Sequence, residues 1–216
     1  MPQFQNFPYP RRYDSLRLRG YGYNAPYDLC AITMSTRLRV PVFADTRLAK
    51  SVLNSLLSDQ TLSRMRVKAY TLMPDHLHFL ATVRNPESYL PSLIGSFESY
   101  TTQLYWKRSN EIVMSQEVCL PPSHLEKIDR MKARPILAAL KHWRANLRPE
   151  VVELKNWPRV RPRHFLRKRL WQREYYDHVI RNDQDLRENL NYIAMNPVKA
   201  GYVSCAQFYP YTGFLE

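Results

Sequence analysis

His76 and His78 form a histidine pair separated by a single leucine. On a β-strand, alternate side chains point to the same face, so both imidazoles would point one way and Leu77 the other. Two neutral imidazoles one pleat apart have the chemistry to share a divalent cation. The apolar residues that follow, 79–81, place the pair in a core strand, where a buried histidine needs a hydrogen bond or a metal. By itself the pattern is weak, because such a pair is more often structural than metal-binding.

A helix predicted over residues 184–195 carries the second group of candidate side chains. At about 100° per residue, Leu186, Leu190 and Ile193 form an apolar stripe. A separate polar stripe consists of Asp185, Asn189, Tyr192 and Asn196. Tyr192 and Asn196 are one turn apart and therefore neighbours on one face, and an amide oxygen is a suitable third metal ligand. With fifteen tyrosines in the chain, the Tyr192–Asn196 pair means little without the histidines.

Together these residues have the chemistry to attack a phosphodiester. A divalent cation on a non-bridging oxygen reduces the charge repulsion that protects the phosphate. A tyrosine can then attack in line, hold the 5′ end covalently and release a 3′-hydroxyl. The energy of the broken bond is kept in the phosphotyrosine link, which suits cutting and rejoining better than degradation. Tyr175 and Tyr176 are rival nucleophiles, although aromatic packing explains them better.

The composition indicates one basic globular domain that binds a polyanion. The chain has 216 residues, 44% of them hydrophobic, and a net charge of +13 with a pI near 9.8. Nucleic acid is the commonest polyanionic partner of such a chain. Candidate phosphate contacts are Arg11, Arg12, Arg17 and Arg19 in a basic arm over residues 1–26, and Arg173, Arg181 and Lys199 around the last helix. As single charges, these side chains are also compatible with plain solvation.

The elements that must position these residues follow from hydrophobic periodicity and turn residues. The first predicted elements are a strand over 27–36 and a helix that is capped by Asp45 or Thr46 and runs to about Asp59. Two strands, Val67–Met73 and His76–Val83, follow and are joined by Pro74-Asp75, and the next element is a helix over 88–106. The last are a short helix or turn over Trp171–Arg181 and a final helix capped by Asp183 and ended by Pro197. This pattern predicts an α+β fold with helices packed on an antiparallel sheet.

Residues 109–165 are predicted to be a basic, proline-containing insertion before the final helix. Between Lys127 and Arg169 there are fourteen Lys and Arg against three Asp and Glu. The segment is partly helical by its pattern, around residues 130–146. A DNA-contacting surface and a solvated linker are both compatible with it. Residues 202–216 are predicted to be an aromatic C-terminal tail.

Several classes of protein are not indicated. The three cysteines form no CxxC pair, so neither a disulfide framework nor a cysteine zinc site is expected. The first twenty residues have no apolar run and no stretch is long enough to span a bilayer, so the protein is expected in the cytoplasm without a membrane partner. The sequence has no P-loop, GxSxG or HExxH motif. A metal hydrolase that activates water is the weakest alternative, because a third His or carboxylate at short spacing is missing.

Four blocks of the sequence resemble the REP-associated tyrosine transposases, a branch of the HUH single-strand endonuclease superfamily. The blocks are RLRGYGYNAPYDLCAITMSTRLRVPVFAD, YTLMPDHLHFLATV, IGSFESYTTQLYWK and LWQREYYDHVIRNDQDLRENLNYIAMNPVKAGYV. They follow one another in the family's order, and together they contain 91 of the 216 residues. The segment YIAMNPVKAGYV in the last block is the most specific part of the resemblance.

The resemblance implies a function and a set of site residues. It makes Tyr192 the nucleophile and makes His76, His78 and Asn196 the ligands of Mg²⁺ or Mn²⁺, with no small-molecule cofactor. It implies a ferredoxin-like, HUH-type sheet, single-stranded or hairpin DNA of the repetitive extragenic palindrome (REP) type as substrate, and a place at the bacterial nucleoid. The insertion over 109–165 is longer than in compact members, which leaves substrate shape and the choice between monomer and homodimer open. A catalytically silent protein that binds DNA or RNA hairpins is the alternative.

Overall fold

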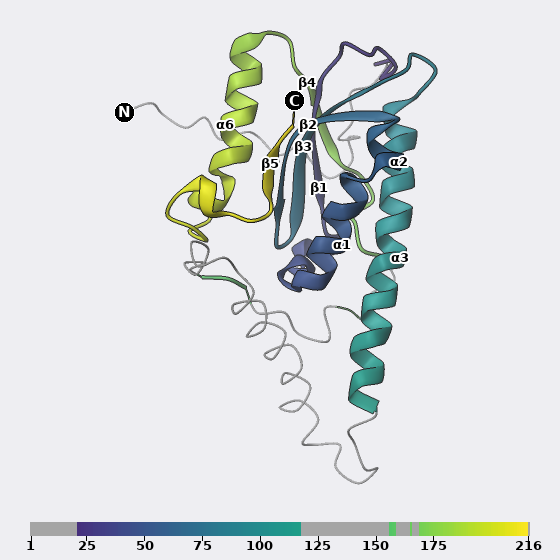
Figure 1. Cartoon of the computed structure of the whole chain (residues 1–216), viewed down its shortest axis with the longest axis vertical. Coiled ribbons are helices and arrows are strands. Elements are labelled where there is room, and N and C mark those ends of the chain that lie inside the picture. Colours follow the sequence, from purple (N-terminus) through teal and green to yellow (C-terminus); the bar gives the residue numbers. More distant parts are fainter. Residues whose placement is uncertain (1–20, 118–155, 159–164, 166–168, 216) are drawn as a thin grey trace.

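The computed structural model describes residues 21–117, 156–158, 165 and 169–215 (Figure 1). Its centre is a five-stranded sheet in the order β4-β1-β3-β2-β5, in which every neighbouring pair is antiparallel. The strands are β1 Cys30–Ser35, β2 Met65–Met73, β3 His76–Val83, β4 Tyr176–Val179 and β5 Thr212–Phe214. With one helical connection between β1 and β2 and another between β3 and β4, the first four strands have the ferredoxin-like arrangement. The predicted α+β fold is confirmed.

The β2–β3 hairpin forms as the sequence predicts. Pro74 and Asp75 connect the two strands, and the register pairs Met73 with His76. The proline restricts its own φ, and an aspartate is a common turn residue, so this dipeptide favours a tight reversal. The turn fixes the position of His76 at the very start of β3.

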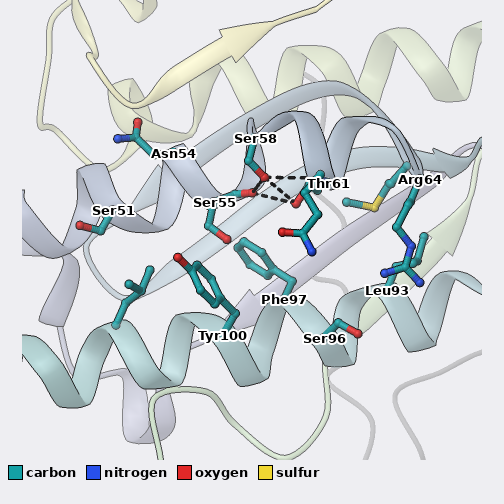
Figure 2. A pocket seen from close by; sticks show the side chains of 13 residues that line it. Ser51, Asn54, Ser55, Ser58, Thr61, Arg64, Leu93, Ser96, Phe97 and Tyr100 are labelled. Atoms are coloured by element: carbon teal, nitrogen blue, oxygen red, sulfur yellow. Dashed lines mark hydrogen bonds between the residues drawn. The ribbon is translucent and has the colours of Figure 1, made fainter.

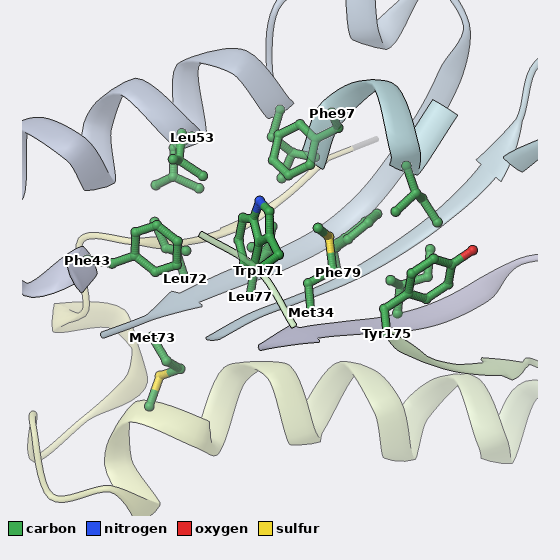
Figure 3. Packing of buried hydrophobic residues seen from close by; sticks show 14 of the residues in the cluster. Met34, Phe43, Leu53, Leu72, Met73, Leu77, Phe79, Phe97, Trp171 and Tyr175 are labelled. Atoms are coloured by element: carbon green, nitrogen blue, oxygen red, sulfur yellow. The ribbon is translucent and has the colours of Figure 1, made fainter. Parts of the chain in front are cut away.

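The main hydrophobic core lies between the sheet and three helices on one face: α1 Thr46–Leu56, α2 Asp59–Leu62 and α3 Leu90–Glu117. Alternate residues of the central strands, such as Met34, Leu77 and Phe79, point into this layer and are almost fully buried (Figure 3). As predicted, Asp45 caps α1, with its side chain accepting a hydrogen bond from the Leu48 amide at 3.0 Å. The described helices include none long and apolar enough to cross a membrane.

Helix α6, Asp183–Lys199, covers the opposite face of the sheet (Figures 1 and 3). Its apolar stripe, predicted from spacing, packs Ile193 against Ala69 and Leu80. This second core is small, and polar residues of the central strands, among them Thr33 and Thr71, share the covered face with it. The helix therefore places its polar stripe against the side of the sheet that carries the two histidines.

Both predicted ends of α6 are corrected by the structure. The N-cap is Asn182, whose side chain accepts a hydrogen bond from the Asp185 amide at 2.9 Å, instead of Asp183. The helix also continues through Pro197 to Lys199. A proline so near the end removes one amide donor without blocking the last turn. The chain leaves the helix at Gly201, whose φ of 71° is the left-handed conformation that glycine adopts without strain.

Three other predictions are wrong or incomplete. The segment Trp171–Arg181 contains strand β4 instead of a helix or turn, because its backbone pairs with the open edge of β1. Helix α3 runs on to Glu117, past residue 109 where the composition changes. Strand β5, which pairs with β2, lies in the tail that carries no strand pattern. The arm over residues 1–20 and the helix predicted around 130–146 lie outside the described residues.

Candidate functional site

His76 and His78 lie on the same face of β3, and their ring centroids are 4.6 Å apart. Leu77 between them is fully buried on the other face, in the main core. The face that carries the histidines is the one covered by α6. The alternation of the strand has therefore placed both imidazoles together, as the sequence predicts.

A row of polar side chains crosses the whole sheet at the level of His78. The register pairs His78 with Thr33 of β1 on one side and with Thr71 of β2 on the other. The row continues to Tyr176 of β4 and Thr212 of β5. Thr33 Oγ1 lies 2.7 Å from His78 Nδ1, and the hydroxyls of Thr71 and Thr212 are 2.6 Å apart. His78 is thus held from the side of β1 and lies in a polar band.

His78 is held as a neutral imidazole. Only 6% of the residue is exposed. Burial, followed by the nearby charges of His76 and Arg39, lowers the pKa of His78 well below its ordinary value. Thr33 occupies Nδ1, whereas the buried Nε2 has no hydrogen-bond partner among the described residues. An uncharged ring with one nitrogen bonded and the other unmatched has the form of a metal ligand.

Tyr192 brings α6 against this histidine. Its ring meets that of His78 in a T-shaped contact with 5.1 Å between centroids. The tyrosine remains 46% exposed, so one side of the ring packs in the site while another part is accessible to solvent. On the same helix, Lys199 places its ammonium 5.5 Å from the centroid of the Tyr192 ring.

Asn196 lies one helical turn after Tyr192 on the same stripe. Its side-chain nitrogen is buried and has no hydrogen-bond partner within the described part of the chain. Either end of an amide can be presented by rotating it through 180°. His78 and Asn196, both predicted ligands, thus each have a buried polar side-chain atom that no described residue partners.

The donor set is compatible with a hard divalent cation. Residues 21–117 and 169–215 contain no cluster of three or more His, Cys, Asp and Glu side chains that could hold a metal. The predicted set needs only two histidines, because its third ligand is an amide. Imidazole and carbonyl-type oxygen both occur as ligands of Mn²⁺ and related metals.

Asp75 and Thr33 are contacts of the site that the spacing of residues in the sequence does not predict. Asp75 Oδ1 lies 2.6 Å from His76 Nδ1, and Thr33 holds His78. Asp75 is adjacent to His76 in the sequence, but the Pro74-Asp75 pair by itself predicts only a turn. The contact of Thr33 with His78 depends on the register between β1 and β3, which pairs these two residues.

The two rival tyrosines lie elsewhere. Tyr175 is 2% exposed and belongs to the main core on the face opposite α6 (Figure 3). Tyr176 is on the correct face, but Thr33 of β1 lies between it and His78 in the row. Two strand spacings of about 4.8 Å separate its backbone from that of His78. Of these three tyrosines, Tyr192 is the one whose ring contacts a predicted metal ligand.

The predicted DNA-contacting residues are only partly brought to the site. Lys199 is there, next to Tyr192. Arg173 and Arg181 are exposed, and Arg181 lies just before the N-terminal end of α6, where its backbone amide donates to Asp185 at 3.0 Å. The four arginines predicted in the N-terminal arm, Arg11, Arg12, Arg17 and Arg19, lie outside the described residues.

A pocket of about 420 Å³ lies on the other face of the sheet (Figure 2). It is formed by α1, α2 and α3 and is lined by hydroxyl and amide side chains, including Ser51 and Asn54, together with Arg64, Phe97 and Tyr100. Because the sheet separates it from α6, this pocket does not contain the histidine–tyrosine site.

No protein-family profile matches the chain. A relative from Haemophilus influenzae, provisionally named REP-associated tyrosine transposase, is 49% identical over 45 residues, which are 21% of this chain and 26% of the relative. The REP-associated tyrosine transposase of Escherichia coli is 40% identical over 47 residues, which are 22% of this chain and 28% of that protein. The chain therefore matches about a quarter of the length of these curated relatives.

A solved structure of a REP-associated tyrosine transposase bound to a REP hairpin is also similar. It has 19% sequence identity and a TM-score of 0.41, and the alignment covers 91% of this chain and 81% of that one. The resemblance to the REP-associated tyrosine transposases that the sequence predicts is confirmed by the two curated relatives over the segments that they match.

Proposed function

We propose that this protein is a metal-dependent transposase that cuts and rejoins single-stranded hairpin DNA through a covalent 5′-phosphotyrosine. The observation that carries the proposal is the contact between Tyr192 and His78, at 5.1 Å between ring centroids. It joins a partly exposed nucleophile to a neutral histidine whose Nε2 is unmatched among the described residues. The names of the two curated relatives and the net charge of +13 support a DNA substrate of the REP type.

In the proposed reaction, Tyr192 supplies the nucleophile. Its hydroxyl oxygen, after losing its proton, attacks the phosphorus in line. A bond forms between phosphorus and this oxygen while the bond to the 3′ oxygen breaks, and the leaving 3′ oxygen takes up a proton. The ammonium of Lys199 near the ring adds positive charge where the phosphate must approach. Rejoining is the reverse step, with the 3′-hydroxyl of another strand as the nucleophile.

His76, His78 and Asn196 are proposed to hold Mg²⁺ or Mn²⁺. When bound, the cation neutralises charge on the non-bridging oxygens of the phosphate. The protein residues orient the ligands: Thr33 bonds to His78 Nδ1 and Asp75 bonds to His76 Nδ1. This function implies that the protein is bacterial and cytoplasmic and associates with the nucleoid.

The first prediction tests the nucleophile. The protein is incubated with a single-stranded DNA hairpin and Mn²⁺, and a covalent adduct is sought on a denaturing gel. Tyr192→Phe removes only the hydroxyl, so adduct formation is expected to disappear while DNA affinity stays within about twofold. Tyr176→Phe is the matched control, because it removes a hydroxyl from the same face of the sheet, and it should form the adduct at the wild-type level.

Two results would contradict the proposal. An adduct of normal yield in Tyr192→Phe would place the nucleophile elsewhere. A wild-type protein that binds the hairpin tightly with Mn²⁺ but forms no adduct would instead indicate a catalytically silent hairpin-binding protein.

A further inference from the structure

The Pro74–Asp75 turn that precedes His76 is fastened to the rest of the fold through its backbone. The carbonyl oxygen of Asp75 accepts hydrogen bonds from the Thr36 amide at 2.8 Å and from its hydroxyl at 3.0 Å. The carbonyl of Pro74 accepts one from the Phe43 amide at 3.0 Å. The turn is therefore held whatever side chain stands at position 75, and the carboxylate of Asp75 is left for another contact.

That carboxylate bridges a histidine and an arginine. Asp75 Oδ1 lies 2.6 Å from His76 Nδ1, and Oδ2 lies 3.6 Å from a guanidinium nitrogen of Arg39. Arg39 and its neighbour Leu38 have φ values of 54° and 59°, in the left-handed region that costs a non-glycine residue on the order of 1 kcal/mol or more. Hydrogen bonds hold this turn at both ends. The Arg39 amide donates to the Thr36 carbonyl at 3.0 Å, and the Thr36 hydroxyl shares its one proton between the Val40 carbonyl at 2.8 Å and the Asp75 carbonyl.

The contacts of Asp75 decide the direction of the hydrogen bond to His76. One oxygen of the carboxylate lies 2.6 Å from His76 Nδ1, and the other faces the guanidinium of Arg39. An ionised carboxylate can only accept, so Nδ1 of His76 must carry the hydrogen. In the neutral ring this leaves the lone pair on Nε2, the nitrogen that a metal would then use.

We infer that Asp75 is a positioning residue that fixes the Nδ1–H tautomer and the orientation of His76, and thereby sets the affinity of the site for its divalent cation. The inference rests on the proposed function, since it concerns the same metal. Arg39 assists by holding the carboxylate from its other side. The Arg39 side chain is 45% exposed and the ion pair is 3.6 Å long, so this pair contributes less to the position of the carboxylate than the contact with His76 does.

The test compares Asp75→Ala and Asp75→Asn with the full-length wild type. The tautomer of His76 is measured in metal-free protein by the ¹⁵N chemical shifts of its ring, and Mn²⁺ binding is titrated separately. Asp75→Ala is expected to move His76 away from the pure Nδ1–H form and to weaken Mn²⁺ binding by about tenfold to a hundredfold. Asp75→Asn keeps an oxygen acceptor without the charge, so its Mn²⁺ affinity should lie between those of the wild type and Asp75→Ala.

Glu87→Ala is the matched control, because it removes an exposed carboxylate just beyond the other end of β3. It should leave both measurements unchanged. If His76 keeps the Nδ1–H tautomer in Asp75→Ala and Mn²⁺ affinity stays within twofold, the inference is wrong, although the transposase proposal survives. If wild-type protein binds no Mn²⁺ while the tautomer still follows Asp75, the metal-dependent function fails and the positioning contact stands.

Discussion

At the scale of single residues, the site pairs a tyrosine with a positive charge on its own helix. Lys199 Nζ is 5.5 Å from the centroid of the Tyr192 ring. A cation at this distance from an exposed ring is worth about 0.5–1 kcal/mol. In the proposed reaction, negative charge would gather here as the phosphate approaches, so the ammonium of Lys199 would also stabilise the reacting state.

Replacing this charge should slow the reaction. Lys199→Met is expected to reduce the single-turnover rate of adduct formation about two- to fivefold, the equivalent of about 0.5–1 kcal/mol. Lys199→Arg should retain most of the rate. Lys107→Met removes the same charge from an exposed position on α3 and serves as the control. Equal slowing by Lys107→Met would mean that overall charge, and not the position of Lys199, affects the rate.

Asp185 ties the start of α6 to β4. Its carboxylate accepts hydrogen bonds from the Arg181 amide at 3.0 Å, from His178 at 2.8 Å and from the Asn189 amide group at 2.9 Å. Burial raises the pKa of Asp185, but the bonds from Arg181 and His178 and their charges outweigh it, so the net pKa lies below the ordinary value of 3.8. A carboxyl with a lowered pKa in the folded state stabilises the fold when it is ionised.

The stability contributed by Asp185 should disappear in acid. It is fully present above the unfolded-state pKa, near 3.8, and is lost as the pH falls through the lower folded-state value. Asp185→Asn is therefore expected to be less stable than wild type at pH 7 by about 1 kcal/mol, with the difference shrinking below pH 4. Urea unfolding at pH 7 and pH 3 measures it. A difference that is the same at both pH values would show that the ionised carboxylate contributes nothing.

At the scale of helices and strands, the two faces of the sheet have different tasks. The face under α1 and α3 holds the large hydrophobic core, whereas the face under α6 combines a small apolar contact with the polar row of His78. One helix therefore supplies both the hydrophobic anchor, Ile193, and the proposed nucleophile, Tyr192, one residue earlier. Because consecutive helical residues differ by about 100° in direction, the burial of Ile193 places Tyr192 at the edge of the interface.

The start of α1 is joined to α3 through Asp45. Its carboxylate caps α1 and also binds the guanidinium of Arg108 at 2.8–3.1 Å, with 2% of the Asp45 side chain exposed. Asp45→Ala removes the cap, worth about 1 kcal/mol, and leaves the mostly buried Arg108 without this partner, so a loss of about 3–5 kcal/mol in unfolding free energy is expected. Denaturation in urea measures this loss.

Two variants separate the cap from the ion pair. Asp45→Asn keeps the acceptor for the Leu48 amide and should lose less than Asp45→Ala. Ser58 caps α2 without a charged partner, accepting from the Thr61 amide at 3.3 Å, so Ser58→Ala should lose only about 1 kcal/mol. If Asp45→Ala loses no more than Ser58→Ala, the contact to Arg108 contributes nothing to stability.

At the scale of the whole molecule, the net charge of +13 predicts DNA binding that weakens steeply with salt. The basic insertion is the expected source of much of this dependence. Changing Arg161, Arg163, Arg167, Lys168 and Arg169 together to Gln should flatten the slope of log affinity against log salt by at most roughly 3.5, since each contact on single-stranded DNA contributes about 0.7. Affinity is measured at two or more salt concentrations. An unchanged slope in a folded variant would identify the segment as a solvated linker.

Substitution is a cleaner test than deleting residues 109–165. The aromatic ring of Phe165 stacks on Tyr105 of α3 with 5.8 Å between centroids, and its carbonyl accepts from the Ser109 hydroxyl at 2.9 Å. Trp157 packs against Tyr202 at 5.0 Å. A deletion would remove these contacts together with the end of α3. Loss of binding after the deletion would therefore mix destabilisation with the loss of charge.

The sequence by itself determined the parts that depend on local spacing. Alternation placed His76 and His78 on one face of a strand, and helical periodicity separated the stripe of Tyr192 from that of Ile193. Turn and capping residues located the β2–β3 hairpin and the start of α1. These features depend only on residues a few positions apart, so their geometry follows from the period of the strand or helix.

Only the tertiary structure decided which of these parts meet. The contact of Tyr192 with His78 depends on how α6 lies across the sheet, and the contact of Thr33 with His78 depends on strand register. Strand β4 was missed because its short segment forms a strand only where the edge of β1 offers unpaired backbone groups. The sequence predicts only a turn role for Asp75, because its bond to His76 depends on side-chain direction, which spacing does not specify. Long-range pairing and side-chain direction are properties of the packed molecule, and local periodicity contains neither.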